Sequence, residues 1–250
     1  MKRIISGIAP FAALAAAALM SQSCLNDDGY DYSQYSPNAI VTFKPLADGG
    51  FYMQLNDETT LFATNVSDCP YDEETRAFVN YSETDADAGE YDAAVNLNWY
   101  SDILTKDMVQ VPDDVTDLDA EYGNDPLDIV VGSWMTVIED GYFTIHFETY
   151  SDGSGRKHKV NLIQPDPSKP YELEFRHDAD GDLTGGRVWS VAAFRLSALD
   201  LPEGESVEIT LKWNSFGAEM SRVFSYVPAG SGVNEGAGSG AGAVPSLNLI

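Results

Sequence analysis

Residues 207–214 read Val-Glu-Ile-Thr-Leu-Lys-Trp-Asn, with an apolar side chain at every second position. This alternation puts the apolar side chains on one face of a strand and the polar ones on the other, as in a sheet that is solvated on one side. Residues 143–148 and 171–176 repeat the pattern. Turn signals such as Asp180-Gly181 separate these strands. We therefore expect an antiparallel β-sandwich over residues 128–227.

The earlier half of the chain contains a second set of strands. Five short runs have β character, at residues 39–43, 51–55, 60–63, 76–81 and 94–99. Five short strands in about 75 residues is typical of a small Greek-key barrel of the OB type. The sequence thus predicts an all-β chain, with a five-stranded OB-type barrel (38–112), an acidic linker (113–127), the sandwich, and a glycine-rich flexible tail (228–250). Within the barrel, residues 103–111 are expected to form a last strand or a short helix.

Residues 1–23 have the features of an export signal. Lys2-Arg3 precedes an apolar run over residues 4–20, and Ser21-Gln22-Ser23 stands before Cys24. The run is marginal for spanning a bilayer, so a transmembrane helix is not expected. The segment resembles the lipobox of bacterial lipoproteins, which implies cleavage before Cys24 and lipidation of that cysteine. Ordinary signal cleavage that leaves a free Cys24 is the alternative.

Residues 24–37 form an acidic tether. Asp27, Asp28 and Asp31 follow the cysteine closely. The tract resembles the signal that sends some lipoproteins to the outer leaflet of the outer membrane. We therefore expect a lipid-anchored outer-membrane protein that faces the cell exterior, with a solvated spacer as the alternative.

The charge of the chain excludes one class of partner. It has 14 Lys and Arg against 40 Asp and Glu, a formal net charge of −26. Such a surface repels phosphate backbones, so we expect no nucleic-acid binding. The expected partners are the membrane, through the lipid on Cys24, and an unknown extracellular protein or glycan.

The best metal candidate is the loop that holds Asp178, Asp180 and Asp182. Alternating carboxylates can converge on a hard cation, so calcium is the candidate ion. The spacing does not match an EF-hand, because Leu183 and Trp189 stand where glycine and glutamate are needed. An acidic hairpin turn is the favoured interpretation, and apart from this weak calcium hypothesis no cofactor is expected.

No catalytic set is expected. The sequence lacks a Gly-x-Ser-x-Gly nucleophile elbow with its flanking strand and helix, and in so acidic a chain no single carboxylate pair is informative. His146, His158 and His177 are the three histidines. They are interpreted as belonging to solvated strand faces, with a two-histidine metal site across a hairpin of residues 143–150 and 157–163 as the alternative. The chain is therefore predicted not to be an enzyme.

Two further residue types have competing interpretations. Trp99-Tyr100, Trp134 and Trp189 would form a stacking platform for sugar rings if they were exposed, but core positions are favoured for the tryptophans. Cys69 lies between Asp68 and Asp72, an environment that does not favour a reactive thiolate. It is interpreted as a structural residue.

Several stretches together resemble the NigD-like family of bacterial lipoproteins. They are residues 26–30 after the cysteine, 39–46, 50–61, 142–150, 157–163, 173–181 and 207–213. The resemblance implies an N-terminal OB domain and a C-terminal β-sandwich, and the family name carries a proposed role in bacteriocin immunity. It implies no enzymatic activity and no site residues. A non-enzymatic binding module is thus the leading hypothesis, and a glycan-binding accessory lipoprotein or a structural envelope component is the alternative.

Overall fold

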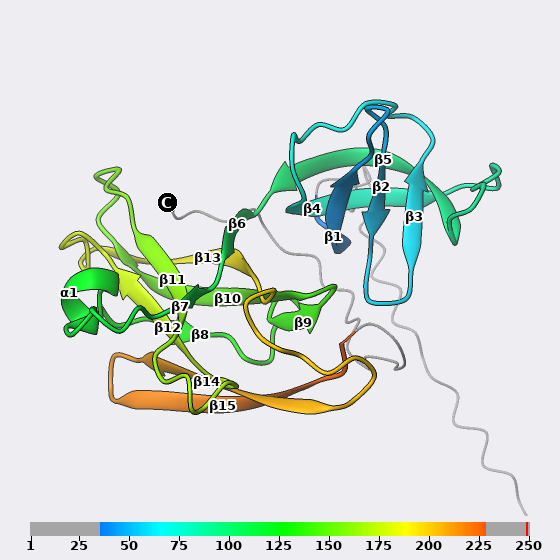
Figure 1. Ribbon diagram of the computed structural model, residues 1–250. Coiled ribbons are helices and arrows are strands. Elements are labelled where there is room, and N and C mark those ends of the chain that lie inside the picture. Colours follow the sequence, from blue (N-terminus) through cyan, green and yellow to red (C-terminus); the bar gives the residue numbers. More distant parts are fainter. Residues whose placement is uncertain (1–35, 229–248, 250) are drawn as a thin grey trace, which may run out of the picture. The chain divides into compact units, whose positions relative to one another are not determined.

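The computed structural model describes residues 36–228 and Leu249. The predicted signal peptide, Cys24, most of the predicted acidic tether and nearly all of the glycine-rich tail lie outside these residues. The described chain is built almost wholly of strands (Figure 1). Its only α-helix, α1 (Leu118–Tyr122), is capped at its N-terminus by Asp117, whose side chain accepts a hydrogen bond from the backbone N–H of Ala120. The predicted all-β class is confirmed.

The first module is a closed five-stranded barrel. Its strands are β1 (Ala39–Pro45), β2 (Phe51–Gln54), β3 (Thr60–Ala63), β4 (Thr75–Glu83) and β5 (Ala93–Asp102). They close in the order β1-β2-β3-β5-β4, with β4 paired back to β1. β3 and β5 run parallel, and the other neighbours run antiparallel. Closure leaves no free sheet edge, and this strand order is the one expected for an OB barrel.

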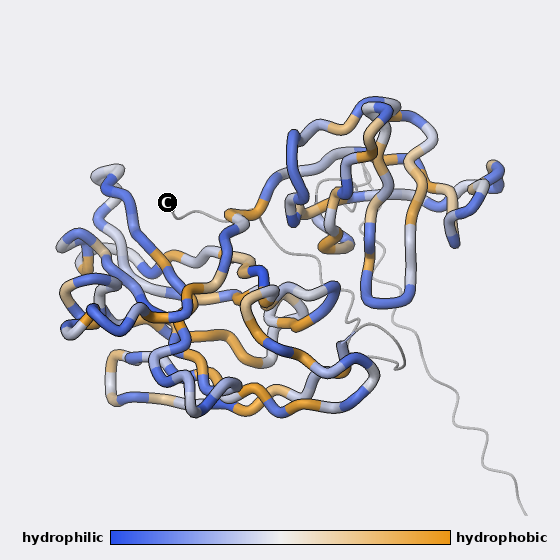
Figure 2. The backbone as a smooth tube through the Cα atoms, in the orientation of Figure 1, coloured by the Kyte–Doolittle hydropathy of each residue, from blue (hydrophilic) through white to orange (hydrophobic). Residues whose placement is uncertain are grey.

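The barrel core is filled by the inward positions of these strands. Val41, Phe43 and Met53 have no exposed surface, while their neighbours Tyr52 and Gln54 are half-buried on the outside. In Figure 2 the strands carry apolar residues in this alternating way, whereas the β2–β3 turn is hydrophilic. The alternation seen in the sequence therefore sorts the side chains between the core and the surface.

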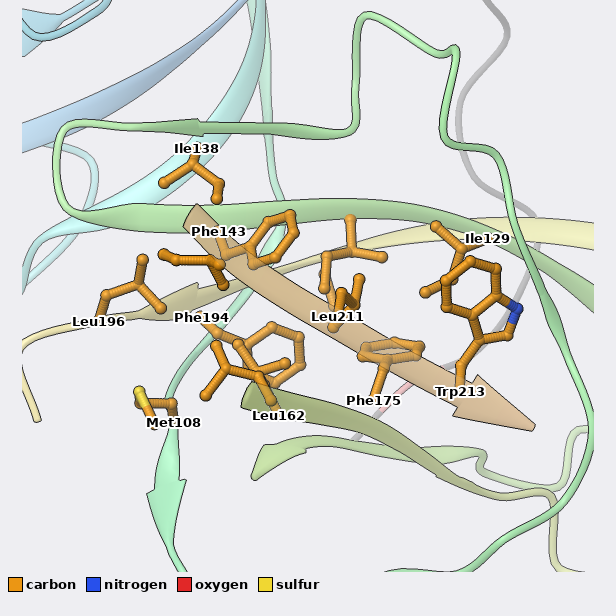
Figure 3. Packing of buried hydrophobic residues seen from close by; sticks show 14 of the residues in the cluster. Met108, Ile129, Ile138, Phe143, Leu162, Phe175, Phe194, Leu196, Leu211 and Trp213 are labelled. Atoms are coloured by element: carbon orange, nitrogen blue, oxygen red, sulfur yellow. The ribbon is translucent and has the colours of Figure 1, made fainter. Parts of the chain in front are cut away.

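The second module is a β-sandwich of two sheets. One sheet has the order β6 (Leu104–Asp107), β13 (Gly186–Arg195), β10 (Tyr142–Ser151), β8 (Asp128–Ile129), with β9 (Val137–Glu139) also paired to β10. The other has the order β15 (Glu219–Tyr226), β14 (Val207–Asn214), β12 (Glu172–Asp178), β11 (Lys159–Gln164), β7 (Val109–Gln110). Their apolar faces share one core, in which Phe143, Phe175, Phe194 and Leu211 interdigitate (Figure 3).

Four details of the prediction need correction. The barrel ends at Ile103 rather than at residue 112, because β6 and β7 pair with the sandwich strands β13 and β11. The sheets are mixed rather than purely antiparallel, since β12 also runs parallel to β14. β10 and β11 do not form a hairpin, because they lie in opposite sheets and residues 152–158 cross between them. In the predicted linker, residues 118–122 form α1.

Barrel and sandwich also share packed side chains. Ile40 and Phe78 of the barrel pack in one cluster with Met135, Tyr142 and Val191 of the sandwich. In the same region the buried guanidinium of Arg76 on β4 forms an ion pair with Glu139 on β9. Among residues 36–228 and Leu249, no helix has the length and apolar character needed to span a membrane.

Candidate functional site

The predicted metal loop does not bring its three carboxylates together. Asp182 is 1% exposed and accepts hydrogen bonds from the hydroxyl of Ser151 (2.7 Å) and the backbone N–H of Asp152 (2.7 Å). Asp178 instead forms an ion pair with Lys159 at 3.6 Å. Asp180 is a turn residue with φ 51°. Across the described ranges, no group of three or more His, Cys, Asp or Glu side chains is placed to hold a metal ion.

Asp182 belongs instead to a buried polar cluster with two histidines. His158 Nε2 lies 3.3 Å from the Asp182 carboxylate, and His158 Nδ1 lies 2.8 Å from His177 Nε2. A carboxylate acceptor places the proton of His158 on Nε2, so its Nδ1 accepts the N–H of His177. The Nδ1 atom of His177 is then an acceptor, and it is buried with no partner among the described residues. The histidines expected on solvated faces at 158 and 177 are therefore core residues.

The ionisation of the cluster follows from its burial. Burial, together with the neighbouring His158, lowers the pKa of His177 to about 4. The hydrogen bond from the Asp152 backbone, followed by those of Ser151 and His158, lowers the pKa of Asp182 to about 2. Near neutral pH the cluster thus holds an ionised carboxylate and an uncharged His177. Because Ser151 donates to Asp182 and not to a histidine, the set is not a nucleophile–base pair.

The tryptophans do not form an exposed platform. Trp213 is 7% exposed in the sandwich core (Figure 3). Trp99, Trp134 and Trp189 are partly buried and pack against the cluster shared by barrel and sandwich. His146 contacts the last of these edge to face, with ring centroids 5.1 Å apart. The core interpretation therefore describes all four tryptophans better than the sugar platform does.

The barrel carries a different aromatic surface. Tyr52 on β2 and Phe62 on β3 occupy outward positions next to buried Met53 and Leu61. Tyr91, from the loop between β4 and β5, stacks against both rings, with centroid distances of 5.3 Å to Tyr52 and 5.8 Å to Phe62. We call these three residues the aromatic cluster.

Asp92 fixes the aromatic cluster in place. Its carboxylate accepts hydrogen bonds from the backbone N–H (2.8 Å) and the hydroxyl (2.7 Å) of Thr60 at the start of β3. These bonds lower the pKa of Asp92. The next residue along the loop is Tyr91, so the bonds to Thr60 hold its ring beside β3.

A cavity of about 580 Å³ opens beside the aromatic cluster. It lies between three segments: the β1–β2 turn, the end of β3 with the residues after it, and the β4–β5 loop. The residues that line it are Leu46, Asp48, Gly50, Phe51, Phe62, Ala63, Thr64, Asn65, Val66, Ser67, Glu90 and Tyr91. The turn is closed by hydrogen bonds from Leu46 N to Gly50 O (2.8 Å) and from Gly50 N to the Asp48 carboxylate (3.1 Å). The cavity is thus formed by the barrel alone.

Several polar groups of the cavity wall are already used by the fold. The Asn65 amide donates to the carbonyl of Leu97 (2.8 Å) and accepts from its N–H (2.9 Å), so it replaces a strand partner of β5. The Thr64 hydroxyl donates to Asn96. Asp48 and Glu90 are exposed carboxylates at the rim. Burial, followed by the neighbouring Glu90, Tyr52 and Asp48, raises the pKa of Tyr91.

The outer surface of the barrel is strongly acidic. Residues 40–103 contain 13 Asp and Glu and only 2 Lys and Arg. Both basic side chains are withdrawn from solvent: Lys44 pairs with Asp140 at 3.0 Å, and Arg76 pairs with Glu139. Of the 13 acidic residues, 12 are exposed and Asp57 is half-buried. A surface without exposed cations gives a strong, one-signed electrostatic field.

Comparison with known proteins agrees with both modules. A family model described as the NigD-like N-terminal OB domain matches residues 40–103, and one described as the NigD-like C-terminal beta sandwich domain matches residues 109–226. The chain belongs to the NigD-like family. The resemblance inferred from the sequence is confirmed, and among curated proteins none matches this chain.

Solved structures with the NigD-like fold share most of their length with this chain. One described as toxin-related, from Parabacteroides distasonis, is 31% identical with a TM-score of 0.64, covering 76% of this chain and 92% of its own. A NigD-like immunity protein from Bacteroides caccae is 19% identical with a TM-score of 0.55, covering 76% and 96%. A Bacteroides fragilis chain described as a lipoprotein is 13% identical with a TM-score of 0.52, covering 77% and 97%.

In this NigD-like chain, strand parity distinguishes the buried histidines from the surface aromatics. Residues two apart in a strand lie on the same face. His158 therefore falls on the buried face with Val160 and Leu162, and His177 on that of Leu173 and Phe175, so the sequence pattern indicates core positions for both. Tyr52 and Phe62, in contrast, are aromatic residues at outward parity. The approach of Tyr91 to them depends on the β4–β5 loop and has no local signal in the sequence.

Proposed function

We propose that this chain is a lipid-anchored, non-enzymatic envelope protein whose acidic barrel binds a cationic polypeptide outside the cell. The proposed consequence is protection of the cell against a bacteriocin. The single observation that supports it most is the charge distribution of the barrel, where 12 acidic residues are exposed and both basic side chains are paired.

The physics of association favours such a partner. A one-signed surface attracts an oppositely charged molecule over about a Debye length, roughly 8 Å at physiological ionic strength. Electrostatic steering raises association rates by about tenfold to a thousandfold and weakens as salt is added. A protein that must intercept a basic toxin before it reaches the membrane benefits from fast capture. Anionic polymers are repelled by the same field.

Family membership supports the same role. The descriptions of two relatives, a toxin-related protein and an immunity protein, concern those proteins, and we extend them to this chain as part of the proposal. The lipid anchor at Cys24 and the acidic tract after it add a location, on the outer leaflet of the outer membrane. At that site a captured toxin would be held outside the cell.

The decisive experiment is a killing assay with a deletion strain. We expect cells that lack the gene to be more sensitive to a cationic bacteriocin, and the intact gene to restore resistance. A strain that carries Cys24→Ala serves as the matched control, because its folded modules are intact but it lacks the proposed anchor. Unchanged sensitivity of the deletion strain across a panel of such toxins would overturn the immunity role.

The location is tested separately by protease treatment of intact cells. We expect added protease to degrade the modules while a periplasmic marker protein survives. Protection of the modules from protease would contradict exposure on the cell surface and leave the periplasm as the location.

A further inference from the structure

The cavity beside the aromatic cluster combines two chemistries at one place. Phe62 and Tyr91 supply aromatic surface, and Asp48 and Glu90 supply exposed carboxylates from two different loops. We infer that this cavity receives the guanidinium group of an arginine side chain from the cationic polypeptide. The inference rests on the proposed function and assigns the contact that gives it specificity.

Arginine fits this combination of groups better than other side chains do. Its planar guanidinium packs against aromatic rings and at the same time donates hydrogen bonds to carboxylates. Asp48 lines the cavity from the β1–β2 turn and Glu90 from the β4–β5 loop, so a bound cation would have two negative groups in the same cavity. Both carboxylates contribute to the raised pKa of Tyr91, so their negative charge acts at this ring. Lysine carries the same charge, but its ammonium group has no planar face to pack against an aromatic ring.

Two polar side chains of the cavity wall are already bonded within the barrel, and the rim carboxylates carry charge, so the wall favours a cation over a neutral sugar. A sugar site needs side chains that are able to hydrogen-bond hydroxyl groups. In this cavity the Asn65 amide is bound on both sides by Leu97, and the Thr64 hydroxyl is bound by Asn96. The carboxylates at the rim favour a positively charged ligand, and they exclude phosphate.

Rigidity supports the assignment of a specific site. Tyr91 is held beside β3 by the bonds from Thr60 to Asp92, and Gly50 is held by Asp48. The segment after β3 is tied to the β1–β2 turn by the bond from Cys69 N to Gly49 O (3.1 Å). Three loops that would otherwise move independently are therefore fixed around one volume, which lowers the entropy lost on binding.

The test is peptide binding to the purified full chain, followed by fluorescence anisotropy. The probe is a labelled arginine nonapeptide, and the comparison probes are the citrulline and lysine nonapeptides. We expect Tyr91→Ala to weaken arginine-peptide binding about fivefold, as the loss of one cation–π contact does, and Tyr91→Phe to retain it. Citrulline should not bind, and lysine should bind more weakly than arginine.

The contribution of the two cavity carboxylates to binding is tested with a matched control. The pair Asp48→Asn and Glu90→Gln removes two charges at the cavity, and the pair Glu83→Gln and Asp85→Asn removes two exposed barrel charges outside it. We expect the cavity pair to weaken arginine-peptide binding at least about fivefold more than the control pair. Circular dichroism of each variant verifies the fold.

The two charge pairs and Tyr91→Ala separate the inference from the proposed function. If both charge pairs weaken binding equally and Tyr91→Ala does not, the acidic surface binds cations but the cavity assignment is overturned. If the wild-type chain does not bind the arginine peptide at all, the cavity assignment and the proposed binding of a cationic polypeptide are both overturned. If a neutral oligosaccharide binds the wild-type chain and Tyr91→Ala abolishes that binding, the ligand of the cavity is a sugar and the arginine assignment is overturned.

Discussion

His158 and His177 are single polar residues at positions where the sandwich needs core side chains. Both are buried, and the hydrogen bonds from His177 through His158 to Asp182 satisfy most of their polar atoms. The sequence alternation shows that both residues lie on the buried side of the sheet. Their acceptor is not evident from the sequence, because Asp182 lies on the loop after β12 and reaches His158 only once β12 has paired with β11 and that loop has folded.

The cluster predicts a pH dependence of stability. In the folded chain the pKa of His177 is lowered to about 4, and in the unfolded chain it returns to 6.5. Between these values the unfolded chain binds a proton that the folded chain does not, so stability is lost as the pH falls. The shift corresponds to about 3 kcal/mol of unfolding free energy.

Urea unfolding at about pH 7 and about pH 4.5 measures this effect. We expect His177→Gln to lose most of the difference between the two conditions. The buried Glu139, whose pKa burial raises, acts in the opposite direction and is unchanged in that variant. An identical pH dependence in wild type and variant would contradict the role assigned to His177.

At the scale of elements, the crossing between β10 and β11 depends on how closely neighbouring loops approach. Gly185, just before β13, has φ +89°, and a Cβ atom there would collide with the backbone of Ser151 and Asp152. Gly153, in the crossing loop itself, has φ +73° and open space around it. Two glycines with the same backbone requirement thus differ only in their packing.

This difference gives a matched pair of substitutions. We expect Gly153→Ala to lower the unfolding free energy by about 1 kcal/mol, the cost of a left-handed conformation for a residue with Cβ. Gly185→Ala adds the collision, so a loss of about 3 kcal/mol is expected. Urea unfolding of both variants gives the comparison, and equal losses would show that the approach of the two loops is not constrained.

At the scale of the whole molecule, a buried ion pair joins barrel and sandwich. The Arg76 side chain has no exposed surface, and Glu139 is 14% exposed. Arg76 also donates to Thr42 (3.2 Å) and lies 5.8 Å from the ring centroid of Tyr142. Removing one partner leaves the other charge buried, whereas removing both does not.

A double-mutant series tests this contact. We expect Arg76→Met to cost about 3 kcal/mol of unfolding free energy, and the double variant Arg76→Met/Glu139→Leu to recover a large part of it. The exposed pair Arg187–Asp128 is the control, where Arg187→Met should cost less than about 1 kcal/mol. If Arg76→Met and Arg187→Met behaved alike, the buried pair would have no special role.

The anchor is also a property of the whole molecule. We expect mass spectrometry of the native protein to find an N-terminal peptide that begins at Cys24 and carries acyl chains. The Cys24→Ala variant should appear in the soluble fraction. An unmodified Cys24 in the native protein would contradict the lipid anchor.

The strands, the two modules and the family could be inferred from the sequence, because period-two alternation and turn residues are local properties of the chain. The sequence also determined the charge of the barrel, since composition does not depend on packing. Three features followed from the fold and not from the sequence: β6 and β7 join the sandwich, Asp182 is the partner of a buried histidine, and Tyr91 stacks beside the cavity. Each of these joins residues distant in the sequence, and such contacts exist only once sheets and loops have packed.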